Sequence, residues 1–338
     1  MKAEATTYDH YIAVDWSIAI MAIARMTSRS NKITVFEGRA DLEEFKMYLK
    51  SLQGTKILTL EESTGSQWLY VELKDHVDRV ILCDPYRNRL LSEGPKTDKI
   101  DASKLVRLLR ADLLKEVFHS NDKFLDLRRL VSAYDDLVKA GVRAKNQRYG
   151  LLRSCGLTGQ EKTGHKLPKD SDQWALASIE RQIESYEKEK AGYEAEFKRL
   201  EKKFPEIRHQ DSLPGIGLIG ALKIVARVVT PKRFPDAGHF LSYAGLIRLE
   251  RNSGGVNYGR KNSRCCRELK AVYKTAALAT LGGESSFNDY YEALIKKGYA
   301  DYNARHKVAR RLAILSWGIF KSGKKYQRRN YVKETQEV

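Results

Sequence analysis

The sequence predicts a mixed α/β domain in its first third and a mainly helical, basic region after it. In residues 11–112, short apolar runs alternate with stretches whose apolar residues recur every three or four positions, as in strands and helices respectively. From residue 125 onward, helical spacing predominates. Charge divides the chain in a similar way, because residues 1–112 hold 17 Lys and Arg against 17 Asp and Glu, whereas residues 207–333 hold 25 against 8.

The N-terminal elements follow an order that defines a fold class. The strands are short runs rich in apolar and β-branched residues, and the first helix is marked by Leu42, Phe45 and Leu49 before the stop signal Gly54. The expected elements are strands at 11–16, 21–26 and 32–37, a helix at 41–53, a strand at 56–62, a helix at 63–76, a strand at 77–85 and a helix at 98–112. This order is that of a ribonuclease H-like fold, a mixed sheet with helices on its faces.

Four carboxylates lie where these elements begin or end. Asp15 closes the first strand and Glu62 closes the fourth, while Asp98 and Asp101 are three residues apart on one face of the last helix. Glu61 is adjacent to Glu62, and alternation lets only one of the two face a shared site. A turn or a helix cap is the alternative for each acid alone.

Acids from three separate segments indicate a site for divalent cations. Two such ions about 4 Å apart activate a hydroxyl and stabilise the leaving oxygen in phosphoryl transfer. Oxygen ligands in an octahedral shell favour Mg²⁺, with Mn²⁺ as the other suitable ion. The sequence therefore predicts a metal-dependent nuclease or recombinase core.

The basic surplus in residues 207–333 predicts a polyanionic partner. A surplus of this size is typical of proteins that bind phosphate backbones, and a solvated basic face is the alternative. Because no signal peptide and no membrane-spanning apolar run is present, we expect a cytoplasmic protein that binds no membrane. The cysteines form no CxxC pair, so neither a zinc ribbon nor a disulfide framework is expected; they are Cys83, Cys155, Cys265 and Cys266.

Residues 121–206 are expected to form a helical connector. The stretch 125–157 has the pattern of one amphipathic helix that stops near Gly156, and a loop follows at 158–172. The next helix repeats apolar residues at alternating spacings of three and four, with one polar break, at Leu176, Ile179, Ile183, Tyr186, Lys190, Tyr193, Phe197, Leu200 and Phe204. This repeat predicts a coiled coil, which either folds back on its own chain as a hairpin or pairs with another copy.

The basic region opens with a Pro-Gly-x-Gly turn before a helix, in SLPGIGLIGALKIVARV. This turn resembles the hairpin of helix-hairpin-helix modules, where Gly215 and Gly217 let backbone amides approach a phosphate at a helix N-terminus. A tight turn between two packed helices uses the same residues and is the alternative.

A serine followed by two glycines lies in a loop rich in cations. Ser253 is a candidate nucleophile, because nearby cations stabilise both its alkoxide and the phosphate that it attacks. An ordinary loop is the alternative. The surrounding candidates for phosphate binding are Arg248, Arg251, Arg260, Lys261, Arg264 and Arg267.

The last helices interleave aromatic and basic residues. Such aromatics stack on unpaired bases or, alternatively, pack in the core with their hydroxyls outward. The aromatic residues are Phe287, Tyr290, Tyr291, Tyr299 and Tyr302, and the basic residues expected to face phosphate are His306, Lys307, Arg310 and Arg311.

Seven blocks resemble, in the same order, the DEDD transposases of insertion-sequence family one hundred and ten, which include the Piv DNA invertases. They are YIAVDWS, EESTG, KTDKIDASKL, SLPGIG, FLSYAGL, NSGG and HKVARRLA, and the likeness runs from about residue 10 to residue 327. The resemblance implies a RuvC-like first domain whose magnesium ligands are Asp15, Glu62, Asp98 and Asp101. Glu62 rather than Glu61 is matched, because the family glutamate lies two residues before Thr-Gly.

The resemblance also implies a mechanism and partners. The family serine, here Ser253, attacks DNA and holds it as a covalent 5′-phosphoserine. Members are guided by a bridge RNA from the element's noncoding end, which pairs with target and donor DNA, and they act as tetramers that combine the acidic domain of one subunit with the serine of another. We therefore expect a prokaryotic, nucleoid-associated recombinase. Its domains would be RuvC-like (1–120), connector (121–206), C-terminal transposase domain (207–330) and tail (331–338).

One block departs from the family pattern. Where members have Ile-Ser-Lys-x-Gly, this chain has Cys265 in place of the glycine, and Ser263 becomes a rival nucleophile. We favour Ser253, because Gly254 preserves the local pattern. The rival functions are a RuvC-like Holliday-junction nuclease, a Piv-type invertase without guide RNA, and a non-catalytic protein that binds nucleic acid.

Overall fold

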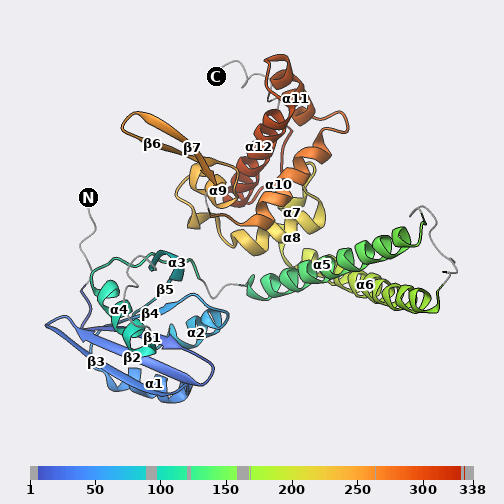
Figure 1. Cartoon of the computed structure of the whole chain (residues 1–338). Coiled ribbons are helices and arrows are strands. Elements are labelled where there is room, and N and C mark those ends of the chain that lie inside the picture. Colours follow the sequence, from blue (N-terminus) through green and yellow to red (C-terminus); the bar gives the residue numbers. More distant parts are fainter. Residues whose placement is uncertain are drawn as a thin grey trace. The chain divides into compact units, whose positions relative to one another are not determined.

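The computed structural model describes residues 7–88, 97–119, 123–157, 167, 169–262, 264–328 and 331. The chain forms two compact units, unit 1 (residues 1–121) and unit 2 (residues 122–338). Unit 1 contains a mixed sheet, and unit 2 is mostly helical (Figure 1). The predicted α/β region followed by a mainly helical region is thus confirmed, while the division into four domains stays a prediction.

Unit 1 is built on a five-stranded sheet in the order β3-β2-β1-β4-β5. β1 pairs antiparallel with β2 and parallel with β4, and β5 is parallel to β4. The strands are β1 (His10–Trp16), β2 (Ile20–Thr27), β3 (Ser30–Arg39), β4 (Lys56–Glu61) and β5 (Arg79–Cys83). An antiparallel meander followed by parallel strands that helices connect is the arrangement expected of a ribonuclease H-like sheet.

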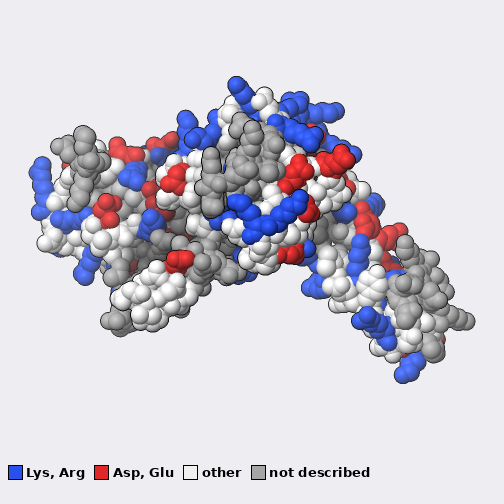
Figure 2. Space-filling view, turned by 90° about the horizontal axis from the view of Figure 1, so that it is seen from above, with Lys and Arg blue, Asp and Glu red and all other residues white. Residues whose placement is uncertain are grey.

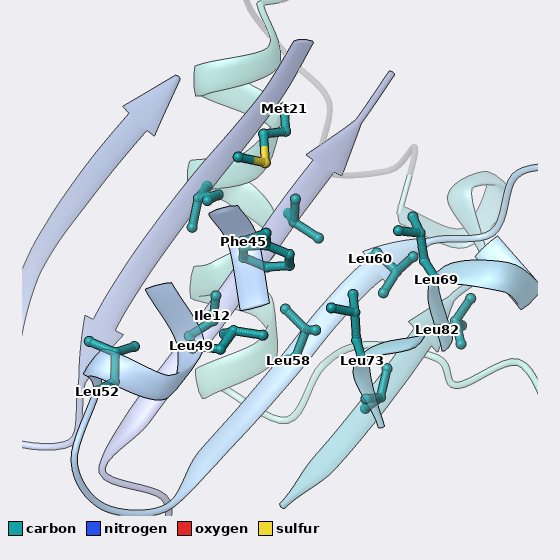
Figure 3. Close-up of a cluster of buried hydrophobic side chains, with 13 residues drawn as sticks. Ile12, Met21, Phe45, Leu49, Leu52, Leu58, Leu60, Leu69, Leu73 and Leu82 are labelled. Carbon is teal, nitrogen blue, oxygen red and sulfur yellow. The ribbon is translucent and has the colours of Figure 1, made fainter. Parts of the chain in front are cut away.

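Helices cover both faces of this sheet and enclose two cores. In the first core, Phe45 and Leu49 of α1 and Leu69 and Leu73 of α2 lie over strand residues such as Leu58 (Figure 3). The second core lies under α4. The helices are α1 (Leu42–Ser51), α2 (Ser66–Leu73), the single turn α3 (Pro85–Asn88) and α4 (Asp98–Arg110).

Successive side chains of a strand point to opposite faces of the sheet, which determines the core that each residue joins. In β1, Ile12 and Val14 belong to the core under α1 and α2, whereas Tyr11 and Ala13 belong to the core under α4. Asp15 continues the second series, so it lies on the α4 side at the end of its strand. The sheet therefore determines which acids can share a site.

Unit 2 combines a helical core with one small sheet. Its helices are α5 (Leu125–Ser154), α6 (Asp170–Lys203), α7 (Pro205–Asp211), α8 (Gly217–Val228), α9 (Ala237–Tyr243), α10 (Arg267–Thr280), α11 (Ser286–Lys296) and α12 (Asp301–Ser322). α12 packs against α7, α9, α10 and α11. A buried network fixes this core, because Ser316 accepts a hydrogen bond from Tyr273 (2.8 Å) and donates one to Gln210 (2.6 Å). The sheet consists of β6 (Arg248–Ser253) and β7 (Val256–Asn262).

Helices α5 and α6 lie side by side as an antiparallel pair (Figure 1). Lys145 forms an ion pair with Glu187, and Arg148 forms one with Glu180 on the preceding turns of α6. All nine positions of the predicted repeat are buried or half-buried within the single chain. The hairpin alternative is therefore present, while coiled-coil geometry and pairing with a second copy stay predictions.

Within the described ranges, none of the helices combines the length and apolar character that a membrane span requires.

Candidate active site

Three of the four predicted metal ligands lie at the same edge of the sheet in unit 1, near enough for their charges to interact. Asp15 is the next-to-last residue of β1, and Asp98 and Asp101 lie in the first turn of α4, which packs against β1 and β2. Asp15 is half-buried. Its pKa is raised to about 6, first by burial and then by the negative charges of Asp98, Glu61 and Asp101. These carboxylates are therefore close enough to repel one another.

The two adjacent glutamates occupy different positions. β1 and β4 pair in parallel with Val14 opposite Leu60, so Asp15 and Glu61 are the next pair and share the α4 side. Glu61, and not Glu62, is among the charges that raise the pKa of Asp15. Glu62 follows the last residue of β4, where alternation no longer fixes the direction of a side chain. The strand register thus places Glu61 beside Asp15, whereas the resemblance to the family motif predicts Glu62 as the metal ligand.

Helix capping does not account for Asp98. Thr97 is the N-cap of α4, and its hydroxyl accepts a hydrogen bond from the backbone N–H of Ile100 (3.3 Å). Neither Asp98 nor Asp101 forms an ion pair or a side-chain hydrogen bond with another residue of the described chain. The N-terminal end of the helix dipole favours both charges. Both carboxylates are therefore available to a ligand.

The chemistry of these side chains suits a hard cation. Carboxylate oxygens are the ligands that Mg²⁺ and Mn²⁺ prefer, and a cation would relieve the repulsion that raises the pKa of Asp15. Among the described residues, however, no three Asp, Glu, His or Cys side chains are gathered closely enough to hold one ion. Metal binding here stays a prediction.

Strands β6 and β7 form a β-hairpin (Figure 1). Ser253 is the last residue of β6, next to the turn, rather than in a flexible loop. Ser253 pairs with Val256, and Gly254 and Gly255 between them have φ values of 56° and 78°. Two residues with positive φ make the two-residue turn whose twist matches that of the flanking strands. Ser253 is exposed, and this turn fixes its backbone. The rival Ser263 lies outside the described residues.

The predicted phosphate contacts around Ser253 are only partly described. Arg264 and Arg267 are exposed between β7 and the first turn of α10. The side chains outside the described part are those of Arg248, Arg251, Arg260 and Lys261. Phosphate binding by these six residues stays a prediction.

Cys265, which replaces the family glycine, has a packing role. A Cβ on Gly245, whose φ is 67°, would lie 2.6 Å from the Cys265 sulfur, so the missing side chain at Gly245 leaves room for this thiol. Burial raises the pKa of neighbouring Cys266 to about 11, which keeps that thiol protonated and unreactive at neutral pH. The four cysteines are free thiols.

The Pro-Gly-x-Gly turn joins α7 to α8, and its two glycines have different environments. A Cβ on Gly215, where φ is 79°, would lie 2.4 Å from the backbone oxygen of Ala276 in α10. A Cβ on Gly217, where φ is 62°, would meet nothing within 4 Å. Gly217 begins α8, which has no side-chain cap, so the first N–H groups remain open to an anion. Close packing explains Gly215, and phosphate binding at this turn stays a prediction.

A groove of about 700 Å³ lies beside this turn, between α5, α8 and α10. It brings Lys139 and Lys223 together with the predicted contact Arg267, while Asp135 and Glu268 supply negative charge. Lys223 pairs with Asp135, with 2.5 Å between nitrogen and oxygen. Sequence reasoning missed both lysines, because spacing within one helix does not show which faces of separate helices meet.

The basic residues predicted on α12 differ in whether they contact aromatic rings of the protein. Arg310 is exposed. The nitrogen of Lys307 lies 4.4 Å from the ring centre of Tyr299, and the guanidinium of Arg311 lies 4.9 Å from that of Tyr331. Two of the predicted phosphate contacts therefore cover aromatic rings in unit 2.

The five aromatic residues predicted here differ in exposure: Phe287 is buried, Tyr290, Tyr291 and Tyr299 are half-buried, and Tyr302 is exposed. Phe287 is fully buried, as the core alternative requires. Tyr302 is 54% exposed, stacks against His306 and has the Lys274 nitrogen 5.4 Å from its ring centre. Of the five, Tyr302 offers the most exposed ring on which a base could stack.

Figure 2 shows one face of the molecule, with lysine and arginine side chains spread over much of it and acidic side chains between them. In that view the basic residues do not form one continuous patch.

Comparisons with known proteins show what the chain is similar to. Residues 12–156 match the model of IS110-type DEDD transposases, and residues 209–292 match that of the transposase IS116/IS110/IS902 family. An IS110 insertion-element protein of Streptomyces coelicolor is 25% identical over 155 residues, which are 46% of this chain and 38% of the relative. The transposase for insertion sequence element IS1111A of Coxiella burnetii is 24% identical over 186 residues, 51% of each chain.

A third relative, an IS116 insertion-element protein of Streptomyces clavuligerus, is 29% identical over 113 residues, 33% of this chain and 28% of the relative. The matches thus span about half or less of each relative. The first model covers the carboxylate edge of unit 1, which consists of Asp15, Glu61, Glu62, Asp98 and Asp101. The second covers the turn with Gly215 and Gly217 and the β6–β7 hairpin with Ser253, here called the serine hairpin. The chain belongs to the IS110 family of DEDD transposases.

Proposed function

We propose that this chain is a DNA recombinase that cuts and exchanges strands between target DNA and the DNA of its own insertion element. Family membership supports the class of reaction. The observation that carries the proposal is the presence in one chain of a carboxylate edge and an exposed serine on a rigid turn. A junction nuclease that activates water needs only the first of these.

Ser253 supplies the nucleophile in this proposal. Its oxygen attacks a phosphodiester phosphorus and loses its proton, while the bond from phosphorus to the 3′ oxygen breaks and that oxygen leaves as a hydroxyl after gaining a proton. The product is a 5′-phosphoserine, which conserves the energy of the bond for joining to a new 3′ hydroxyl.

The carboxylates bind and orient metal ions in this proposal. Mg²⁺ or Mn²⁺, bound by Asp15, Glu62, Asp98 and Asp101, would stabilise negative charge on the phosphate oxygens. Glu61 stands beside Asp15 and adds to the negative charge of the site. Gly217, Lys223 and Arg267 would hold the DNA backbone in unit 2.

The partners in this proposal are target and donor DNA, a guide RNA from the element's noncoding end, and further copies of the chain as a dimer or tetramer. The RNA is tested by purifying the protein from its host and sequencing the nucleic acid bound to it. A discrete RNA from the element supports the guide. Its absence would favour an invertase that recognises DNA without RNA.

The nucleophile is tested by trapping protein–DNA adducts on DNA that contains the element's end. We expect Ser253→Ala to abolish adducts that resist denaturant, and Ser263→Ala to leave them. Adducts that persist in Ser253→Ala and disappear in Ser263→Ala would transfer the role to Ser263. Hydrolysed products with no adduct in the wild type would favour the nuclease.

A further inference from the structure

The β6–β7 hairpin carries an aromatic side chain that the fold does not use. Every residue from Asn252 to Gly259 is exposed, with Val256 at 55% and Tyr258 at 66%. Within the described part of unit 2, no hydrogen bond or ring contact is found for Tyr258. A ring this exposed on a two-stranded ribbon contributes little to stability. The ring is therefore accessible to a binding partner.

Strand register places Tyr258 on the same face of the ribbon as Ser253. Residues directly opposite each other in an antiparallel pair share a face, so Ser253 and Val256 lie on the same side. Val256 and Tyr258 are two apart on β7 and share that side as well. Tyr258 is therefore the diagonal neighbour of Ser253, at a separation of roughly 7–8 Å, with the Cβ atoms somewhat closer.

A β-bulge fixes the backbone around this tyrosine. The register passes from Glu250 opposite Arg260 to Asn252 opposite Asn257, so two residues of β7 face one residue of β6. Gly259 has a φ of 93°, and its N–H donates a hydrogen bond to the side-chain oxygen of Asn257 (2.7 Å). Tyr258 is thus held between a bulge and a tight turn rather than on a loop.

We propose that Tyr258 is a positioning residue that stacks on the DNA base next to the phosphate attacked by Ser253. This inference rests on the proposed function. A phosphate at the serine brings its flanking nucleotide within reach of the diagonal position. An aromatic face holds any base without reading sequence, which suits an enzyme whose target choice is made elsewhere. The aromatic ring makes the contact with the base, and the hydroxyl is not needed for it.

DNA is the partner that the geometry favours over RNA or protein. The tyrosine shares its face with the nucleophile, and the nucleophile acts on DNA. An RNA contact at Tyr258 would leave Ser253 facing the guide instead of its substrate. A packing role against a second copy of the chain would require no nucleic acid at all. Both alternatives are outcomes of the test below.

The first part of the test is photocrosslinking with Ser253→Ala protein, which cannot form the serine adduct. The probe is duplex DNA of the element's end with 5-bromodeoxyuridine in place of thymidine. We expect a crosslink that mass spectrometry maps to Tyr258, and its loss in Ser253→Ala/Tyr258→Ala. A crosslink from this residue to bromouridine-labelled RNA instead, or none from this residue, would overturn the proposal.

The second part measures adduct yield with Ser253 intact. We expect Tyr258→Ala to lower the rate of adduct formation roughly tenfold, as loss of one stacked base would, and Tyr258→Phe to retain it. Tyr149→Ala, which removes a half-exposed tyrosine from α5, is the matched control and should have no effect. Equal rates for Tyr258→Ala and Tyr149→Ala would overturn the stacking role.

The two parts separate this inference from the proposed function. If wild-type protein forms no adduct, the proposed nucleophile fails, and the crosslink at Tyr258 alone decides whether the ring contacts DNA. If adducts form through Ser253 but the crosslink is absent, the nucleophile stands and the inference about Tyr258 fails.

Discussion

The carboxylate edge of unit 1 and the serine hairpin of unit 2 position reactive groups in opposite ways. Asp15 is held by a strand in the middle of a five-stranded sheet with a packed core on each face. Ser253 is held by a two-residue turn in a ribbon whose residues pair mainly with each other. Substitutions in the sheet should therefore alter stability and activity together, whereas substitutions in the hairpin should alter activity alone.

The largest effect is expected from Asp98→Asn, which tests whether the edge is catalytic or only part of the fold. Loss of a metal-binding carboxylate should reduce strand cleavage by about a thousandfold or more, as with other groups that stabilise charge in the transition state. Cleavage and DNA affinity are measured together, because affinity should change little.

The matched control is Asp126→Asn, which neutralises an exposed acid in the first turn of α5. It should leave cleavage unchanged. Normal cleavage by Asp98→Asn would mean that this group of carboxylates is a structural feature and not part of the catalytic machinery.

The next test concerns the two glutamates at the same edge. We expect Glu62→Gln to lower cleavage roughly a hundredfold, as loss of one group that stabilises charge in the transition state does, without moving the pKa of Asp15. Glu61→Gln should lower the pKa of Asp15, because its charge is among those that raise it. Carbon NMR of the Asp15 carboxyl reports the pKa. If Glu61→Gln causes the larger loss of cleavage, then the register and not the motif identifies the ligand.

A smaller effect, on stability, distinguishes the glycines of the helix hairpin in unit 2. Gly215→Ala combines a positive φ with a methyl group 2.4 Å from a backbone oxygen, and should cost roughly 2–5 kcal/mol of unfolding free energy. Gly217→Ala has the same conformational penalty in open space and should cost about 1–2 kcal/mol. Urea unfolding measures both.

For DNA affinity we expect the opposite ranking of Gly215→Ala and Gly217→Ala. Gly217→Ala should weaken binding more than Gly215→Ala does among molecules that remain folded, because a methyl group at Gly217 stands at the open N-terminus of α8. Equal unfolding costs would contradict the packing assigned to Gly215.

The smallest effect comes from the titration of Asp15. Its pKa is about 6 in the folded protein against an ordinary 3.8, so the ionised form is disfavoured and wild-type stability falls as pH rises from about 4 to 6. Without divalent ions, Asp15→Asn should therefore be more stable at neutral pH by about 1 kcal/mol, after allowance for screening of a half-exposed group.

The difference should vanish below about pH 4, where the carboxyl is protonated in both states, and shrink when Mg²⁺ is added to the wild type. Thermal unfolding at several pH values measures it. A wild type that is as stable as Asp15→Asn at every pH would mean that neither burial nor the neighbouring carboxylates disfavour the ionised form of Asp15.

The sheet was predictable from sequence because its signals are local. Runs such as YIAVDW mark strands, and the spacing of Phe45 and Leu49 marks α1, so the order of elements followed. The position of Glu61 beside Asp15 was not predictable, because it depends on which residues of β1 and β4 pair. The cap at Thr97 likewise depends on where α4 begins.

The hairpin was missed for a different reason. Its strands are rich in Arg and Asn and lack the apolar alternation that identifies a strand with one buried face. One signal was available, since two glycines between extended segments are typical of a two-residue hairpin turn. The packing of Gly215 against α10 joins residues about sixty positions apart, and no local pattern reveals it.

The lysine and arginine that lie over Tyr299 and Tyr331 affect how DNA binding should respond to ionic strength. Each phosphate neutralised by a cation releases counterions, and the number released sets the slope of affinity against salt concentration. A cation contributes to that release only where it contacts a phosphate, and these two cations lie against aromatic rings instead. The slope for this protein should therefore be shallower than the surplus of positive charge in residues 207–333 suggests.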